Sequence, residues 1–441
     1  MRSPQRREVS RRVFLGAATA LLAVEAVPGA SAAAVPAGQR NARAFLVAAM
    51  DAAPGPVSLS QSYADEAGLF TTAFTYDNAL AVLALLALGD QDSCARAVRL
   101  GDALRYAQLH DPEHDDGRLR QAYDVGPYTF YDGTPQPHGF VLPDGSANIG
   151  ARFGFVGTAV GDMAWAGLAL TALAERLGES RFLTSAVTIG EWIERNAHSD
   201  GPLGGYRFGA DGRGNSLPQQ SVEHNIDLVA LFGKLARLTR DRVWAARREH
   251  ARAFVLRMWN PDGDFFHTGT NDGATVNPFP VPEDAQTWAH LALGGHGEAL
   301  DWVVTNLAVT DHAGQPNSTV PDGQRYDGVT FSTASLVADD SGPVRNPNRA
   351  GVWFEGTAHL ALALRGRDRR AASRLLASVE QAQARLGAGQ SVGGIALPAG
   401  CGVVAASSPI DSGFGFGYFP HRHVGATAWY LLAATGTNPF R

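Results

Sequence analysis

Acidic side chains recur where six apolar stretches of this 441-residue sequence begin. Five stretches start with a carboxylate and the sixth with histidine: Asp77, Asp162, Glu223 with Asp227 one turn later, Asp284, Glu355, and His421 with His423. A carboxylate near a helix N-terminus can satisfy free backbone N–H groups and complement the helix dipole. Capping is therefore the simplest interpretation of each residue. It suits Asp162 best, because that residue follows Gly161, and Glu355 least, because apolar residues precede it.

Capping does not require aromatic neighbours, yet aromatic residues accompany these carboxylates. They are Phe74, Tyr76, Trp165, Trp288, Trp353, Phe354, Phe416, Tyr418, Phe419 and Trp429. Aromatic rings offer large apolar faces on which the C–H faces of sugar rings stack, while carboxylates bind sugar hydroxyl groups. The combination therefore indicates carbohydrate chemistry. The expected substrate contacts are Tyr76, Asp162, Trp165, Asp227, Trp288, Trp353, Tyr418 and His423.

Glycoside hydrolysis uses two carboxyl groups, one protonated and one ionised. Glu355 best fits the general acid, because its neighbours Trp353 and Phe354 are apolar and an apolar setting raises the pKa of a carboxyl group. Asp77 or Asp284 is the candidate base that activates water. Glu223 is the second choice for the acid.

Other residue patterns give no sign of a metal or a cofactor. The histidines are scattered without an HExxH or comparable spacing, so no zinc site is expected. Cys94 and Cys401 fit neither a metal nor a redox spacing, and whether they pair is left open. We expect catalysis without a cofactor.

The six apolar stretches predict buried helices, because a helix that is apolar on all sides is buried. They cover residues 75–88, 161–173, 222–235, 283–293, 351–365 and 423–434. Six amphipathic stretches alternate with them and predict outer helices with one apolar face. These cover residues 39–52, 92–109, 180–196, 242–259, 297–307 and 369–386.

The connections between these stretches are asymmetric. Each link from an apolar to an amphipathic stretch is a few residues with Gly or Asp, as in a tight turn between helices. The opposite links are long: 53–74, 110–160, 197–221, 260–282, 308–350 and 387–421. Long loops in a compact domain are usually functional. All six would lie on the face where the apolar helices start, which makes that face the predicted active site. If the ring closes, the last apolar helix lies beside the first amphipathic one, and the two ends of the domain are expected to be adjacent.

This organisation resembles the six-hairpin glycosidase superfamily, the (α/α)6 toroids that include glucoamylase-like and cellulase-like enzymes. Segments such as FTYDNALAVLALLALGD and VWFEGTAHLALAL carry the resemblance, which covers residues 33–441 as a single domain. It implies an all-α toroid of six helical hairpins and an inverting hydrolysis. In such a ring Asp77 and Asp284 face each other, and Glu223 faces the sixth inner helix, as the catalytic acid does in glucoamylase-like relatives.

Two other functions remain open. A polysaccharide lyase would use Tyr418 or Tyr76 with His423 to remove a proton beside a uronate. It would need cations near the helix starts, where Arg152, Arg207, Arg349 and Arg422 are the candidates. The other alternative is a non-catalytic carbohydrate-binding protein on the same scaffold, whose carboxylates would all bind backbone amides.

Residues 1–32 have the features of an export signal. Residues 10–16 (SRRVFLG) resemble the twin-arginine motif, an apolar run follows, and Ala30-Ser31-Ala32 is a small-residue cleavage pattern. The expectation is a secreted protein that contacts the twin-arginine export machinery. No later run is long enough to cross a bilayer. With a net charge of −6 and no basic stripe, nucleic-acid binding is not expected, and we expect a monomer.

Overall fold

The computed structural model describes residues 35–150 and 155–441. The chain divides into two units, Met1–Val35 and Pro36–Arg441, and the account below concerns the second. The predicted export signal lies outside the described residues and stays a prediction. Within the described part, no helix combines the length and hydropathy that a membrane crossing requires.

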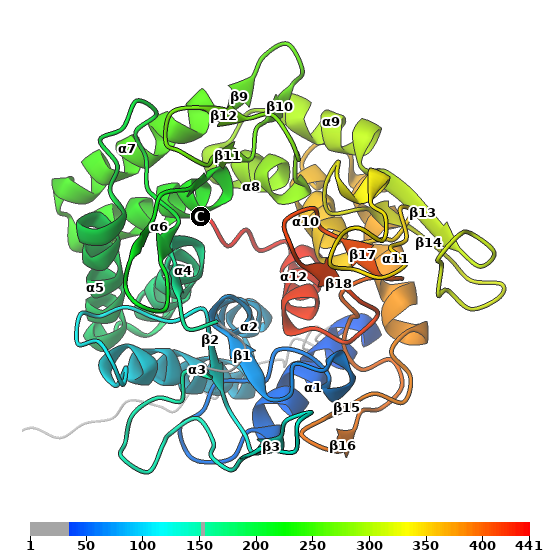
Figure 1. The fold of residues 1–441 in the computed structure, drawn as a ribbon, viewed down its shortest axis with the longest axis horizontal. Coiled ribbons are helices and arrows are strands. Elements are labelled where there is room, and N and C mark those ends of the chain that lie inside the picture. Colours follow the sequence, from blue (N-terminus) through cyan, green and yellow to red (C-terminus); the bar gives the residue numbers. More distant parts are fainter. Residues whose placement is uncertain (1–34, 151–154) are drawn as a thin grey trace, which may run out of the picture. The chain divides into compact units, whose positions relative to one another are not determined.

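The described residues form twelve α-helices in two concentric rings (Figure 1). The inner helices are α2 (Thr75–Leu88), α4 (Val160–Leu177), α6 (Val222–Thr239), α8 (Glu283–Leu293), α10 (Phe354–Leu364) and α12 (Val424–Thr435). The outer helices are α1 (Ala37–Ala52), α3 (Gln91–Leu109), α5 (Ser180–Ala197), α7 (Arg242–Arg257), α9 (Gly297–Asn306) and α11 (Arg369–Arg385). Each inner helix packs against the next, and α12 closes the ring against α2. The predicted all-α (α/α)6 toroid is confirmed.

Residue types explain the burial of the inner helices and the points at which helices begin and end. Every residue of α10 is buried, as expected for a helix that is apolar on all sides. Three outer helices begin at an aspartate whose side chain accepts backbone N–H bonds: Asp90, Asp241 and Asp368. Gly89 and Gly178 end α2 and α4 in the left-handed conformation that glycine adopts without strain. The resulting turns are short, so the long loops collect where the inner helices begin.

Short antiparallel strands lie in these loops. They are β1 (Thr72–Phe74), β2 (Ala122–Asp124), β3 (Tyr128–Thr129), β4 (Pro135–Gln136), β5 (Thr158–Ala159), β6 (Gly209–Ala210), β7 (Ser216–Leu217), β8 (Gln220–Ser221), β9 (Trp259–Asn260), β10 (Phe265–Phe266), β11 (Gly269–Thr270), β12 (Val276–Asn277), β13 (Ala308–His312), β14 (Arg325–Val329), β15 (Ser391–Val392), β16 (Ile395–Ala396), β17 (Ile410–Asp411) and β18 (Gly417–Tyr418).

A belt of six equivalent hydrogen bonds joins neighbouring hairpins. The first residue of each inner helix donates its backbone N–H to a carbonyl in the long loop of the next hairpin. The pairs are Thr75 to Gln121, Val160 to Phe208, Val222 to Thr268, Glu283 to Phe331, Phe354 to Ala405 and Val424 to Ser62, at 2.8–3.1 Å. These bonds satisfy N–H groups that a helix N-terminus leaves free. They also give all six inner helices a common register.

Three residues further on, each inner helix holds its own long loop by a side chain. The acceptors, with the loop residue whose N–H they bind, are Asn78 for Ser60, Met163 for Leu119, Asn225 for Tyr206, Gln286 for Phe266, Thr357 for Val329 and Thr427 for Val403. We call these six side chains the clamp residues. Together with the hydrogen-bond belt, they attach the start of every inner helix to its own long loop and to the long loop of the next hairpin.

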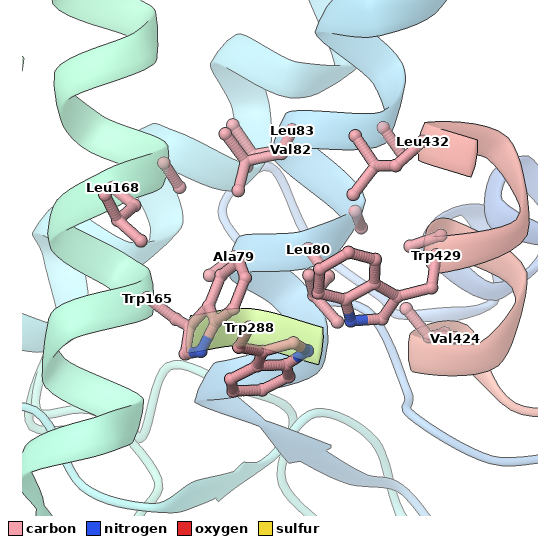
Figure 2. Close-up of a cluster of buried hydrophobic side chains, with 14 of the residues drawn as sticks. Ala79, Leu80, Val82, Leu83, Trp165, Leu168, Trp288, Val424, Trp429 and Leu432 are labelled. Carbon is pink, nitrogen blue, oxygen red and sulfur yellow. The ribbon is translucent and has the colours of Figure 1, made fainter. Parts of the chain in front are cut away.

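The ring is filled by aromatic residues below its mouth. Figure 2 shows the indoles of Trp165, Trp288 and Trp429 gathered together, with centroids 5.1–5.7 Å apart. Phe440, which follows α12, packs against all three. Asn438 donates to the Leu291 carbonyl, and the end of the chain thus lies inside the ring (Figure 1).

This tail corrects the expectation that the two ends of the domain are adjacent. Helices α1 and α12 do pack together, as predicted. The residues after α12 leave α1 because the Phe440 ring, 4% exposed, is buried against the three indoles. Burying an aromatic side chain of this size is strongly favourable.

Candidate active site

The common register places equivalent residues of the six inner helices at equal depth. The second residues form an upper tier: Tyr76, Gly161, Glu223, Asp284, Glu355 and Gly425. Side chains four residues apart on a helix lie one above the other. The lower tier is therefore Leu80, Trp165, Asp227, Trp288, His359 and Trp429. Three carboxylates, two glycines and Tyr76 make the upper tier, and aromatic rings make most of the tier beneath it.

Two adjoining cavities open at the mouth of the ring. The inner cavity, about 510 Å³, is lined by the five predicted carboxylates Asp77, Asp162, Glu223, Asp284 and Glu355. The outer cavity, about 550 Å³, lies over the starts of α6 and α8. The two share a wall, formed by Gln121, Phe208, Glu223, His224, Asp284, Phe331 and Phe416. Among the described residues, neither lining includes Lys or Arg.

Glu355 is contacted by Tyr76 of α2 and by His423, the residue just before α12. Its Oε1 accepts a 2.6 Å hydrogen bond from the Tyr76 hydroxyl, which in turn accepts from the Trp429 indole N–H at 2.8 Å. Its Oε2 lies 3.4 Å from His423 Nδ1. Burial raises the pKa of Glu355 to about 7, although His423 and the Tyr76 hydroxyl oppose the rise by favouring the carboxylate.

His423 connects Glu355 with Asp77. Its Nε2 lies 3.0 Å from Asp77 Oδ1, and the Tyr63 ring stacks on the imidazole at 4.1 Å. Burial disfavours protonation, but the two carboxylates outweigh it and raise the pKa of His423 above its ordinary value. Asp77 thus contacts a buried imidazole, and its expected role as the water-activating base stays a prediction.

Glu223 has no comparable partners among the described residues. His224 Nε2 lies 3.9 Å from Glu223 Oε2, and 29% of the Glu223 side-chain surface remains accessible. Burial, followed by the neighbouring carboxylates Asp284, Asp162 and Glu355, raises the pKa of Glu223 well above its ordinary value. The protonated form is thus favoured at neutral pH.

Asp284 shares this wall with Glu223. Burial raises the pKa of Asp284 to about 7, although the Ala285 N–H bonds its carboxylate. Like charges at close range disfavour joint ionisation, so Glu223 and Asp284 titrate as a pair. At neutral pH the pair retains at least one proton.

Asp162 and Asp227 do not behave as the sequence suggested. Asp162 is not a cap, because α4 begins after Ala159 without a side-chain cap. Its carboxylate accepts the backbone N–H of Tyr76 on the neighbouring helix, and burial together with Asp77 raises its pKa to about 8. Asp227 is fully buried beneath Glu223 and lines neither cavity, so it is not placed to touch a substrate.

The other expected contacts lie where the sequence placed them. Tyr76, Trp165, Trp288, Trp353, Tyr418 and His423 all line the inner cavity. Trp353 and Tyr418 face each other there, with ring centroids 5.3 Å apart. The aromatic wall and the carboxylates thus share one enclosed volume.

Sequence reasoning missed a buried pair behind Glu355. His359 Nδ1 lies 3.1 Å from Glu283 Oε2, and His359 Nε2 lies 3.8 Å from Glu355 Oε1. Burial raises the pKa of Glu283 and lowers that of His359, so the pair is uncharged at neutral pH. The signal was present in the sequence, since His359 stands four residues after Glu355 and therefore on the same helix face.

Within residues 35–150 and 155–441, no group of three or more His, Cys, Asp or Glu side chains is arranged to hold a metal ion. Cys94 and Cys401 are free thiols, which answers the question of their pairing. A further cavity of about 340 Å³, lined by loop residues such as Asn317 and Arg349, lies apart from these carboxylates.

No protein-family model and no curated protein matches the sequence. Solved structures do match. A D-mannose isomerase is 12% identical with a TM-score of 0.57, covering 92% of this chain and 99% of that one. A cellobiose 2-epimerase from Bacillus thermoamylovorans is 11% identical with a TM-score of 0.57, covering 90% and 97%.

A family 76 glycoside hydrolase from a bovine Bacteroides thetaiotaomicron strain is 10% identical with a TM-score of 0.56, covering 91% of this chain and 78% of that one. Identities this low speak for fold and leave activity open. The chain thus shares the (α/α)6 toroid fold of these solved structures.

Proposed function

We propose that this protein is a glycoside hydrolase acting on an uncharged oligo- or polysaccharide, with Glu223 as general acid and Glu355 as the ionised carboxylate. One observation carries the proposal: two carboxyl groups line the same aromatic cavity, and only Glu355 has a hydroxyl donor and an imidazole at its oxygens among the described residues. Environments that push two pKa values apart mark the acid and its partner.

The environment of Glu223 suits a proton donor. Carboxylates surround it and it makes no hydrogen bond to a described residue that would hold its proton. Its side chain is accessible from both cavities, so it can reach the glycosidic oxygen of a bound sugar. A general acid needs a proton at neutral pH and access to the leaving group.

The environment of Glu355 suits the ionised partner. The Tyr76 hydroxyl and the His423 imidazole both face its oxygens, and both interactions stabilise a carboxylate. The distance between the two carboxyl groups in the substrate complex decides between attack on the sugar and activation of water. Asp284 is the third carboxyl group and shares its proton with Glu223.

This assignment reverses the one favoured by the sequence, in which Glu355 was the acid and Glu223 the second choice. The apolar neighbours of Glu355 along the chain suggested a protonated group. The partners from α2 and from the residues before α12 favour its carboxylate, and they lie far away in the sequence.

The cavities favour an uncharged sugar. A lyase acting on a uronate needs cations, and no Arg or Lys of the described residues lines either cavity. The Tyr76 hydroxyl is engaged with Glu355 and Trp429, and burial and Glu355 raise its pKa, which makes it a poor base. A purely binding protein is disfavoured as well, because Glu223 and Glu355 do not bind backbone amides.

A sugar epimerase or isomerase is the second candidate. His224, on the third inner helix, and His423, just before the sixth, line the inner cavity from opposite sides of the ring. Burial lowers the pKa of His224 to about 4, whereas Asp77 and Glu355 raise that of His423 despite its burial. One imidazole is then neutral and the other favours its proton, as proton transfer on two faces of a sugar requires.

Product analysis tests the proposal. The purified protein is incubated with a panel of neutral oligosaccharides and polysaccharides, and the products are identified by mass and NMR. We expect shorter sugars, and we expect Glu223→Gln to lower kcat by about 10²–10⁴-fold. The matched control is Glu298→Gln, on outer helix α9 and away from both cavities. Products of unchanged mass would favour the epimerase, and full activity of Glu223→Gln would remove Glu223 as the acid.

A further inference from the structure

The outer cavity differs in chemistry from the inner one. Outside the wall that it shares with the inner cavity, no described residue of its lining is charged. Amide and hydroxyl side chains of the loop strands line it, such as Gln220, Thr270 and Asn277. Phenyl rings line it as well, of which Phe414 and Phe416 are 40% and 46% exposed.

The two exposed phenyl rings of the outer cavity are held in place by neighbouring residues. Phe414 and Phe416 lie in the loop between β17 and β18, and each makes an edge contact with Phe331 at 5.8–5.9 Å. The strand pairing of Ile410 with Tyr418 anchors both ends of this loop. Large apolar groups kept rigid and partly exposed beside amide side chains form a surface suited to an amphipathic ligand.

The position of the proposed acid connects the two cavities. Glu223 and Asp284 belong to both linings, whereas Glu355 belongs to the inner one alone. A general acid protonates the oxygen that bridges two sugar units. If Glu223 is that acid, the bridging oxygen lies at the shared wall, with one unit on each side.

We propose that the outer cavity is the binding site for the leaving sugar, an uncharged saccharide unit that stacks on Phe414 and hydrogen-bonds to the amide side chains of the same lining. This inference rests on the proposed hydrolase function and extends it to the substrate. The inner cavity then holds the sugar that is attacked, enclosed by Trp353, Tyr418 and the carboxylates. The two volumes, about 510 and 550 Å³, each fall in the range of small-ligand sites.

Two phenylalanines near the same hairpin provide a matched test. Phe414 and Phe419 are each 40% exposed, but Phe414 lines only the outer cavity and Phe419 only the inner one. Both are changed to alanine in the Glu223→Gln protein, which retains the bound sugar intact. Titration calorimetry then measures binding of the monosaccharide, disaccharide and trisaccharide of the sugar that the product screen identifies.

We expect the disaccharide to bind about tenfold more tightly than the monosaccharide. Phe414→Ala should abolish that gain and leave monosaccharide binding unchanged, whereas Phe419→Ala should weaken both ligands equally. Equal weakening of both by Phe414→Ala, or no gain from the second unit, would overturn the subsite. Thermal unfolding of each variant excludes misfolding.

The subsite and the hydrolase can fail separately. Turnover of the panel with no effect of Phe414 would leave the hydrolase standing without this subsite. A Phe414-dependent gain in disaccharide binding together with products of unchanged mass would retain the subsite and reject the hydrolase.

Discussion

Gly161 and Gly425 are the two upper-tier positions without a side chain, and they provide the space between the carboxylates. A Cβ at Gly425 would lie 2.7 Å from Asp77 Oδ1 and 2.8 Å from Glu355 Oε2, closer than real contacts allow. A Cβ at Gly161 would meet the His224 ring at 2.4 Å. Both glycines lie within helices, where alanine would ordinarily be preferred. The site geometry therefore explains why these residues are glycine.

Gly425→Ala is expected to lower kcat at least about tenfold while the fold persists. The new methyl group must displace the oxygens of Asp77 and Glu355, and small displacements of reacting groups are costly in rate. The control is Gly233→Ala in α6, whose Cβ would meet only the flexible Arg248 side chain at 3.5 Å. Steady-state kinetics and melting temperatures of both variants check this. Unchanged turnover in Gly425→Ala would show that the contact relaxes without consequence.

At the scale of single residues, the sequence was sufficient to identify the carboxylates of the candidate site but not the partners that surround them. The five carboxylates were identified because each follows a loop and starts an apolar run. Their partners were not, because Tyr76 and Glu355 are 279 positions apart and His423 and Asp77 are further apart still. Burial raises the pKa of Glu355 to about 7, and the partners His423 and Tyr76 limit that rise.

The inner helices share the clamp residues, which no sequence motif indicates. The clamp residues occupy one register position, yet their types are Asn, Met, Asn, Gln, Thr and Thr. Each supplies an acceptor to a loop N–H, which is the only property that they have in common. Alternation of apolar and amphipathic stretches predicted the helices well. The first predicted residues of the fifth inner helix are extended instead, because Trp353 pairs with Ala406.

Asn225→Leu is expected to destabilise the protein by about 2–4 kcal/mol, since unpaired buried polar groups cost about 1–3 kcal/mol each. Asn225 accepts from the Tyr206 N–H and donates to the Tyr206 and Ser221 carbonyls. Met163→Leu, at the same register position, should cost less than about 1.5 kcal/mol, because a thioether is a weak acceptor of similar volume. Urea denaturation of both variants measures the difference. Equal losses would contradict the clamp role.

For the whole domain, the carboxylate cluster makes stability depend on pH. Burial raises the pKa of Asp162 to about 8 and those of Asp284 and Glu355 to about 7. In the unfolded chain these groups titrate near 4. The folded protein therefore binds more protons above pH 4, and the free energy of unfolding falls as pH rises. The raised pKa of His423 acts in the same direction above pH 6.5.

Buried His224 and His359 act in the opposite direction. Burial lowers their pKa values, so these two residues bind fewer protons in the folded state than in the unfolded chain, and only below about pH 6.5. Above that pH they are neutral in both states. We expect the melting temperature to fall from pH 6.5 to pH 8.5, as differential scanning calorimetry can measure. Asp162→Asn should flatten this dependence, and a melting temperature that rises with pH would refute the assignment.

The ring closes where the last inner helix meets the first part of the domain. Val424 bonds Ser62, Trp429 bonds Tyr76, and His423 contacts Asp77, so residues 423–441 complete contacts begun more than 340 positions earlier. Contacts of such sequence separation form late in folding, because the entropy of closing the chain must be overcome first. During synthesis, five hairpins can stack before residues 423–441 are available. At that stage Glu355 lacks the His423 imidazole, and Tyr76 lacks the Trp429 indole. The proposed active site is therefore the last part of this fold to be completed.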